Sequence, residues 1–432
     1  MTTAIIDSPK AAPRDPAGAP AGSASLEPKV SEVLTRFTAW LERFGETSWD
    51  HQSFFAGPIG SRAKELYYRN KALGTAAVAP MIFFEAFLPS ARRLFHHPIR
   101  FPIADAHYAM GFAFLHEATK ERAHLEKAVH FLHELEKSRC EGFQDYCWGY
   151  PFDWVTRNGT MTRQTPLITS TPYGWEAFLQ VSQLDDRPEW KDVLRSIARH
   201  AARDIKDFRT SDTASSCSYT PFDGGGVINA AAYRAFLLTS ASQVLGEPVY
   251  RQIADRNLNF VIDNQNPDGS WYYATDGVRD FVDHFHTCFV MKALAKVHDL
   301  TGDERCLAAL ARGVEYYRAN LFGEDGLPRP FARAPRLTVY KCELYDCAEC
   351  INLCLLLRDR FPQLDSTLRG VVAGVTNDWV KPDGSFRSRR LHFGWDNVPM
   401  HRWAQSQMFR SLAFWLRDSR APRRSRAAAF TQ

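Results

Sequence analysis

The feature that most constrains the fold of this chain is an apolar helical pattern that returns six times. The apolar stretches begin near Asp105, Thr171, Val227, Phe285, Tyr345 and Met400. Successive starts lie roughly 55 to 65 residues apart, which leaves room for two helices and two loops in each interval. The repeat therefore predicts six helical hairpins in sequence.

Between the apolar stretches lie amphipathic segments that mix charged residues with one apolar stripe, as a helix with one face in water does. These segments are 122–137, 190–208, 249–264, 304–320 and 364–380, and residues 30–44 have the same character. The apolar stretches contain more small residues, which suits helices crowded around one axis. The alternation predicts an all-α fold, an (α/α)6 toroid of six inner and six outer helices.

Asp-Gly turns mark the ends of several of these helices. The runs DGSW at 268–271 and DGSF at 383–386 are close copies, and DGLP at 325–328 is a looser one. Glycine adopts the positive φ that such turns require without steric cost. Ahead of the first hairpin, residues 67–95 are interpreted as a helical pair broken near Gly74 and Pro80, followed by a loop at 96–102.

The length and composition suit a single large domain. At 432 residues, 45% of them hydrophobic, the chain can bury an extensive core. We expect a toroid at 29–418 between two disordered tails, one at 1–28, rich in Pro, Ala, Gly and Ser, and a basic one at 419–432. The start of the chain lacks the pattern of a signal peptide, so a cytoplasmic protein is expected.

Net charge and hydropathy argue against two classes of partner. The net charge is only +4 and basic residues gather in the C-terminal tail, so nucleic-acid binding is not expected. No stretch reaches the roughly 18 apolar residues of a membrane-spanning helix, so membrane insertion is not expected either. The sequence leaves the oligomeric state open.

Nine cysteines are scattered through apolar helical stretches, which suits buried free thiols in a reducing compartment. Cys342, Cys347, Cys350 and Cys354 lie close together and raise the alternative of zinc binding. No second pair or histidine partner completes a tetrahedral set, so core packing is preferred. We expect no metal and no other cofactor, since nucleotide-binding glycine motifs are also absent from the sequence.

The loops that lead into the inner helices are where we expect the chemistry, because in a toroid they gather at one end, beside the positive ends of the helices. The fourth loop contains Trp271, Tyr273, Arg279, Asp283, His284 and His286. Asp283 and His286 are three residues apart and can share a helix face, where the carboxylate would orient the imidazole for proton transfer. Alternatively, Asp283 caps the helix and His286 packs below it.

Neighbouring loops supply further candidate acids and bases. They are Glu343 and Asp346 before the fifth inner helix, Asp396 and His401 before the sixth, and Asp223 before the third. Asp346 could equally be a helix cap. The candidate binding residues around them are Arg336, Tyr340, Tyr345, His392, Trp395, Arg402 and Trp403. Arg336 or Lys341 would neutralise the carboxylate of a sugar acid.

Aromatic and polar residues before the second and third inner helices complete the predicted binding set. They are Trp148, Tyr150, Asp153, Trp154, Tyr173, Trp175, Tyr219 and Asn229. Aromatic faces stack on the C–H faces of pyranose rings, and nearby polar groups select the hydroxyls. Packing in the core is the alternative for each aromatic side chain.

Several of these runs resemble a known group of proteins. The alternating helices, with the DGSW and DGSF turns, resemble the six-hairpin glycosidase and terpenoid-cyclase-like toroids. More narrowly, six runs resemble proteins of bacterial polysaccharide-biosynthesis loci: WGYPFDW at 148–154, TPLITSTPYGWEAF at 165–178, SYTPFD at 218–223, DGSWYY at 268–273, VDHFHTCF at 282–289 and MHRWAQSQMFRSL at 400–412. The resemblance covers about residues 105–416 and implies the toroid fold. The Asp-rich DxDD run of a class II terpenoid cyclase is absent; Asp185 and Asp186 form only a simple pair.

Together these features predict an enzyme that acts by acid/base chemistry on a polar or uronic-acid-containing glycan, or on its precursor. Two reactions suit the residues: glycosidic cleavage by two carboxylates, and proton abstraction beside a carboxylate as in epimerases and lyases. A terpenoid-handling toroid and a non-catalytic glycan-binding protein are the alternatives.

Overall fold

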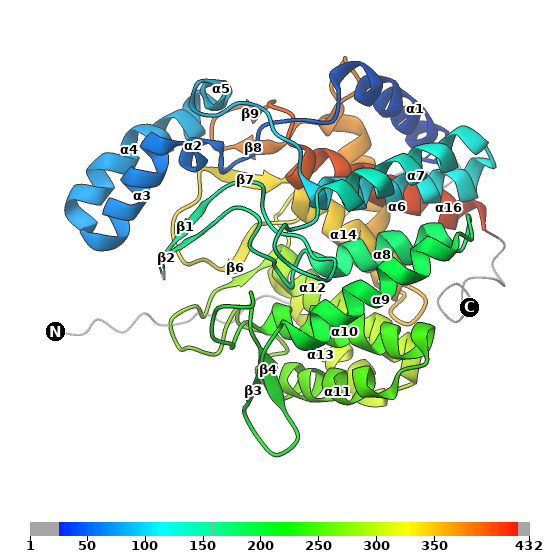
Figure 1. Cartoon of the computed structure of the whole chain (residues 1–432). Helices are drawn as coiled ribbons and strands as arrows, with labels where there is room; N and C mark the ends of the chain where they lie inside the picture. The colour runs from blue at the N-terminus through cyan, green and yellow to red at the C-terminus, as the bar shows by residue number, and fades with distance from the viewer. Residues whose placement is uncertain (1–25, 158, 422–432) are drawn as a thin grey trace.

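The computed structural model describes residues 26–157 and 159–421 (Figure 1). Within that part, six helices pack side by side in a closed ring, with the last against the first. They are α6 (Pro102–Thr119), α8 (Thr171–Ser182), α10 (Ile228–Leu245), α12 (His284–Thr301), α14 (Leu344–Leu357) and α16 (Ser406–Arg420). The π-helical turn η4 (His401–Gln405) leads directly into α16. Each inner helix, counting η4 with α16, begins at or within three residues of its predicted start.

A second set of helices packs outside this ring against the inner helices; α9, for example, contacts both α8 and α10. They are α7 (Arg122–Lys137), α9 (Pro188–Arg203), α11 (Pro248–Asp263), α13 (Glu304–Asn320), α15 (Leu364–Gly374) and, against α16, α1 (Leu26–Phe44). The first helix of the chain thus pairs with the last and closes the ring. The predicted (α/α)6 toroid is confirmed.

Two outer helices end earlier than the sequence predicts. Helix α9 stops at Arg203, because 207–209 pair as strand β3 with β4 (Ser215–Cys217). Helix α15 gives way to the π-helical turn η3 (Val375–Trp379).

The two closely similar Asp-Gly turns, DGSW and DGSF, dock tightly on outer helices. Gly269 has φ +90°, and a Cβ there would lie 2.4 Å from the backbone oxygen of Arg312 on α13. Gly384 has φ +97° and faces the backbone oxygen of Arg36 on α1 in the same way, at 2.5 Å. In both turns the preceding aspartate accepts a hydrogen bond from the backbone nitrogen of the following serine. The repeated turn is therefore a device that fastens each loop to a neighbouring hairpin.

Short antiparallel strands connect the loops that lead into the inner helices. They are β1 (Trp154–Thr156) with β2 (Gly159–Met161), β5 (Val282–Asp283) with β6 (Phe331–Arg333), and β7 (Tyr340–Glu343) with β8 (Arg389–Leu391) and β9 (Trp395–Asp396). Strand β5 runs straight into α12 and β7 into α14. The register of β7 with β8 places Glu343 opposite Arg389.

Between α1 and α6 the chain forms a helical insert made of α2 (Ser53–Ala56), α3 (Pro58–Arg69), α4 (Lys71–Phe87), the 3-10 turn η2 (Pro89–Ala91) and α5 (Arg92–Phe95). Helices α3 and α4 pack together as a hairpin that projects from the toroid (Figure 1). The predicted break near Gly74 and Pro80 is wrong, because both residues lie inside α4. The break falls at Asn70, whose backbone is extended and whose side chain caps α4 by accepting from the Leu73 nitrogen at 3.1 Å.

The ends of the toroid lie slightly outside the predicted limits. Helix α1 takes in residues 26–28 and α16 extends to Arg420, while residues 1–25 and 422–432 of the predicted tails lie outside the described residues. All nine cysteines are buried free thiols, as predicted. Among the described helices, no single one is long and apolar enough to cross a membrane; α4 and the η2–α5 segment pass that test only as a pair, which is bent by 119°.

Candidate active site at the mouth of the toroid

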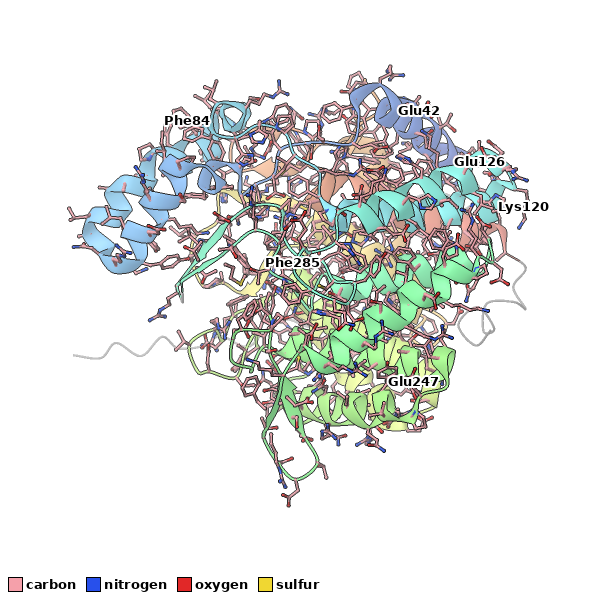
Figure 2. The ribbon with its side chains drawn as sticks, in the orientation of Figure 1. Glu42, Phe84, Lys120, Glu126, Glu247 and Phe285 are labelled. Atoms are coloured by element: carbon pink, nitrogen blue, oxygen red, sulfur yellow. The ribbon has the colours of Figure 1, made fainter. Side chains whose placement is uncertain are left out.

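The N-terminal ends of the inner helices and the loops leading into them form one end of the toroid, here called the mouth. Aromatic contacts join residues of three of these segments. The rings of Tyr345 and Trp403 stack with centroids 4.3 Å apart, and Phe285 contacts both, at 5.3 and 5.5 Å. Figure 2 labels Phe285 near the middle of the molecule. The predicted convergence of these loops is therefore present in the structure.

Asp283 and His286 form a hydrogen-bonded pair at the start of α12. Asp283 Oδ1 accepts from the backbone nitrogen of His286 at 2.9 Å, and Oδ2 lies 2.6 Å from Nδ1 of the same imidazole. Asp283 therefore both caps α12 and pairs with His286, so the two predicted alternatives are present together. Because a carboxylate only accepts, Nδ1 carries a hydrogen, so in the neutral imidazole the lone pair is on Nε2. The His286 side chain is 20% exposed, and no described residue bonds Nε2, so this nitrogen is a base with access to solvent.

Asp346 provides a candidate proton donor on the first turn of α14. The side chain is buried, and neither carboxyl oxygen has a hydrogen-bond partner among the described residues. Burial, together with the nearby acids Glu343 and Asp283, raises the pKa of Asp346 well above its usual range, which favours the protonated form of this carboxyl group. The alternative of a helix cap is wrong, since a cap would engage a backbone N–H.

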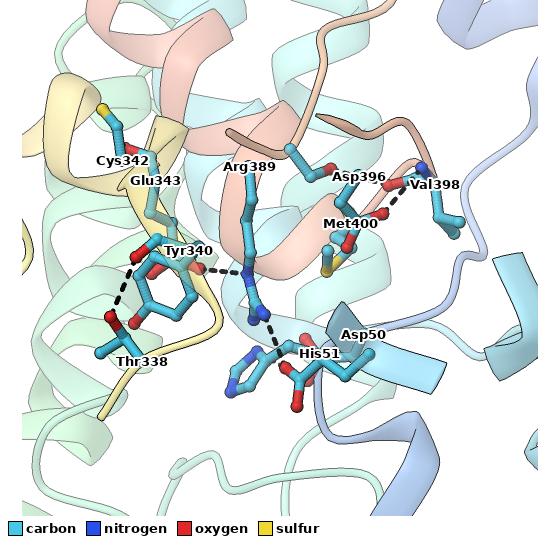
Figure 3. Close-up of polar contacts among 12 residues, drawn as sticks. Asp50, His51, Thr338, Tyr340, Cys342, Glu343, Arg389, Asp396, Val398 and Met400 are labelled. Carbon is cyan, nitrogen blue, oxygen red and sulfur yellow. Dashed lines mark hydrogen bonds and ion pairs between the residues drawn. The ribbon is translucent and has the colours of Figure 1, made fainter. Parts of the chain in front are cut away.

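Glu343 is bound into a buried network centred on Arg389. Nε of Arg389 lies 2.6 Å from Oε1 of Glu343, and Nη1 lies 2.7 Å from Oε1 of Glu85 on α4. Figure 3 shows the Arg389 side chain extending from β8 between Glu343 and His51. Burial raises the pKa of Glu343 more than Arg389 lowers it. Glu343 therefore positions Arg389. Because its carboxyl group is engaged by that arginine, we do not propose Glu343 as a proton donor.

The segment before α2 brings two residues to the mouth that the sequence analysis did not identify. Asp50 binds Arg402 through both carboxylate oxygens, at 2.7 and 2.9 Å. The His51 ring lies 4.7 Å from that of Trp403. Burial and the nearby cations Arg389 and Arg402 hold the pKa of His51 well below its usual range, so its imidazole is neutral. The polar and aromatic run SWDHQ at 48–52 could have marked Asp50 and His51 as candidates. It was missed because it does not directly precede an inner helix.

Three partly exposed tyrosines lie near the pair of Asp283 and His286. Tyr150, Tyr219 and Tyr273 are partly accessible, yet burial raises the pKa of each phenol. The Tyr273 ring is 4.7 Å from His286, and Arg402 lies over Tyr150 at 4.6 Å. Their role as ligand-contacting residues stays a prediction.

Below the mouth, charged side chains continue along the axis of the toroid. Lys292 pairs with Glu349 and Lys296 with Glu176, and Arg410 Nη1 lies 3.3 Å from His107 Nδ1. The hydroxyls of Tyr173 and Tyr233 are hydrogen-bonded to each other, and Asn229 is buried without a partner among the described residues. The sequence pattern that could have revealed these buried charges is the pair Lys292 and Lys296 inside an otherwise apolar helix.

Several predicted acids and bases are engaged in contacts that stabilise the fold. Asp396 forms a buried ion pair with Arg92 at 2.7 Å. His401 is held between the Tyr108 hydroxyl and the Gly45 carbonyl, and burial lowers its pKa to about 4. Asp223 accepts two backbone hydrogen bonds within its own loop. We therefore assign these three no part in proton transfer.

Many predicted binding residues likewise lie away from Tyr150, Tyr219 and Tyr273. The indoles of Trp148, Trp175 and Trp271 are buried between helices, and their nitrogens donate to Leu135, Ser240 and Val261. His284 is buried against Tyr317 of α13. Asp153 accepts from the backbone of Arg163 in the β1–β2 hairpin, where Trp154 contacts Tyr150 edge-on.

The remaining predicted residues lie at the rim. Tyr340 lies beneath Arg389, and Arg279 is paired with Asp276 above Tyr273. His392 and Trp395 line a separate surface hollow together with Lys341 and Arg390. Arg336 is exposed, and its charge is close enough to lower the pKa of Lys64 on α3.

Comparisons with known proteins identify the fold. No family model and no curated protein sequence matches the chain. Among solved structures, the chain resembles cellobiose 2-epimerase from Bacillus thermoamylovorans B4167, with a TM-score of 0.59 at 9% identity over 73% of this chain and 87% of that one. It resembles the unsaturated glucuronyl hydrolase of Bacillus sp. GL1, with a TM-score of 0.59 at 12% identity over 90% and 96%. A polysaccharide lyase matches with a TM-score of 0.52 at 12% identity over 80% and 96%.

At these identities the similarity establishes the fold alone. The neighbours are (α/α)6 toroids of the glycosidase-like type, in agreement with the resemblance noted in the sequence.

Proposed function

We propose that the protein is a carbohydrate-active enzyme that transfers protons at a polar or uronic-acid-containing sugar. The pair of Asp283 and His286 carries the proposal, because it presents a basic nitrogen to solvent at the start of an inner helix. Asp283 holds the imidazole in one tautomer and stabilises the imidazolium that forms when Nε2 takes a proton. Asp346, whose pKa is raised by burial and by neighbouring acids, is the candidate acid.

The charge pairing at the mouth favours histidine-based proton transfer over hydrolysis by two carboxylates. Hydrolysis of that kind needs two carboxyl groups that face the glycosidic bond or a water molecule. Asp50, Glu343 and Asp396 each bind an arginine. Asp346 is then left without a carboxylate partner of the required kind. Abstraction of a proton from carbon, as in an epimerase or a lyase, needs only the base and the acid.

Two cations at the rim support a sugar carboxylate as part of the substrate. Lys64 on α3 and Arg336 form no ion pair within the described residues. Burial and the charge of Arg336 lower the pKa of Lys64 to about 8. An anion bound between them would relieve this repulsion.

The wider setting of the proposal comes from the sequence resemblance and the fold. The resemblance favours a role in polysaccharide biosynthesis, and the nine buried free thiols suit a reducing, cytoplasmic compartment. Solved structures with this fold include an epimerase, a glucuronyl hydrolase and a polysaccharide lyase, and the name of each describes an enzyme that acts on a sugar. The charged pairs along the axis disfavour a terpenoid substrate, which would need an apolar cavity.

The test is isotope exchange. The full chain is incubated in deuterium oxide with uronate-containing oligosaccharides and with neutral disaccharides, and the sugars are analysed by mass spectrometry. Deuterium uptake without chain shortening identifies epimerisation, and an unsaturated product identifies elimination. The His286→Ala variant should lose the activity, whereas His392→Ala, on the separate hollow, should keep it. Binding of these sugars with no exchange and no cleavage would leave a glycan-binding protein instead.

A further inference from the structure

The α3–α4 hairpin carries most of the exposed apolar surface of the described chain. Nine of the 16 large apolar side chains exposed in the described residues lie between residues 58 and 95. They include Ile59, Leu73, Phe83, Phe87 and Leu94, with exposed fractions from 51% to 87%. We call this the apolar hairpin surface. Patches of this kind on a soluble domain mark contacts with another molecule.

Helix α4 differs from the outer helices of the toroid. Its residues 72–84 include no charged side chain. An ordinary surface helix has a charged face toward water, and a helix that is apolar all round is covered by protein or by lipid. Helix α4 projects away from the ring, so its outer face has no cover from the described chain (Figure 1).

Basic and tyrosine side chains surround the apolar hairpin surface. Arg62, Arg69, Lys71 and Arg93 are exposed, and none forms an ion pair with a carboxylate of the described residues. At the α3–α4 turn the Lys71 amino group lies 3.8 Å from the centre of the Tyr67 ring. Apolar side chains bordered by tyrosine and by unpaired cations are typical of segments that lie in the headgroup region of a membrane.

We propose that the α3–α4 hairpin docks on an anionic lipid bilayer as a peripheral contact. Anionic headgroups complement the four unpaired cations, while Phe83 and Phe87 enter the apolar boundary. A symmetric contact with a second copy would instead bring the same cations together. The 119° bend after α4 keeps this apolar stretch from crossing the bilayer as one rod.

The docking surface lies close to the candidate active site. Phe83 and Phe87 flank Glu85, which binds Arg389 in the mouth. Membrane contact therefore lies within about one helical turn of that network. The proposal is independent of the reaction and goes beyond it, since it names a surface and the chemistry of its partner.

Flotation of the full chain with vesicles tests the proposal. The protein should float with vesicles that contain phosphatidylserine and should be released as salt rises, but it should not float with phosphatidylcholine alone. Phe83→Glu with Phe87→Glu should weaken binding about tenfold or more. Arg62→Glu with Arg69→Glu should weaken it about fivefold or more for each residue reversed.

Matched variants on other surfaces should bind as the unmodified protein does. Phe222 is 72% exposed and far from the hairpin in sequence, and Arg195 is an exposed arginine on α9, so Phe222→Glu and Arg195→Glu serve as controls. Equal binding to neutral and anionic vesicles would overturn the proposal. A protein that does not float with any vesicles would also overturn it. If light scattering then showed a dimer that Phe83→Glu dissociates, the hairpin surface would be a contact between two copies instead.

Discussion

Asp283 combines two functions in one side chain, because its two oxygens do different things. Oδ1 fixes the first turn of α12 by accepting a backbone hydrogen bond, and Oδ2 orients the imidazole three residues later. The helix start therefore sets the position of the base relative to the main chain. A residue that caps a helix costs about 1 kcal/mol when removed, whereas the loss of an oriented base costs far more in rate.

Replacement of Asp283 by asparagine separates the two functions. Asparagine still caps a helix, so the free energy of unfolding should fall by less than about 1 kcal/mol. The neutral amide neither stabilises an imidazolium nor fixes the tautomer, so turnover should fall about 10² to 10⁴-fold. Thermal unfolding and kcat measure the two effects. Asp303→Asn, at the cap of α13, is the control and should leave kcat unchanged; an equal loss there would contradict the assignment.

Asp346 should make stability fall with rising pH. Its pKa is raised in the folded protein, so the folded state binds more protons than the unfolded state above about pH 4, the usual pKa of an aspartate. The free energy of unfolding should therefore decrease as pH rises from there toward the folded pKa. Asp346→Asn removes this dependence, so the variant should gain stability relative to the parent between pH 5 and pH 8 in urea unfolding. A constant difference would show that Asp346 is ionised.

At the scale of elements, local periodicity was enough to place the helices but not the site. The apolar repeat located the inner helices because the periodic apolar residues that each helix buries all lie within its own stretch of sequence. The pairs that build the mouth are not local: Asp50 and Arg402 are 352 positions apart, and Glu85 and Arg389 are 304 apart. No pattern within one segment reveals such partners. Asp283 and His286 could be predicted because both lie in one helical turn.

The insert before α6 should depend on the Asp50–Arg402 pair. Burial alone would raise the pKa of Asp50, but Arg402 outweighs it and holds that pKa below its usual range. Arg402→Leu leaves the carboxylate buried without its partner, which should cost about 3 to 5 kcal/mol. In the Asp50→Asn, Arg402→Leu double variant the loss should be smaller. Urea unfolding of the two singles and the double measures this coupling, and additive losses would contradict it.

For the whole molecule, ring closure is the property on which the site depends. Every segment of the mouth is held by a hairpin whose neighbours are hairpins, and the first helix of the chain supplies the outer partner of the last. Side chains from the insert and from the loop before α16 meet only if that ring is closed. A toroid of this kind should therefore unfold as one unit, although its hairpins are separate in sequence.

Phe37 is the residue with which to test cooperative closure. It is fully buried on α1 and stacks on Phe386 and on Phe409 of α16, each with ring centroids 5.1 Å apart. Phe37→Ala should cost about 3 to 5 kcal/mol because a cavity opens between the first and last helices. If the ring unfolds as one unit, hydrogen exchange should speed up in α6, α12 and α16 alike, and urea unfolding should stay a single transition. Faster exchange confined to α1 would mean that α1 detaches on its own and that the inner ring is stable without it.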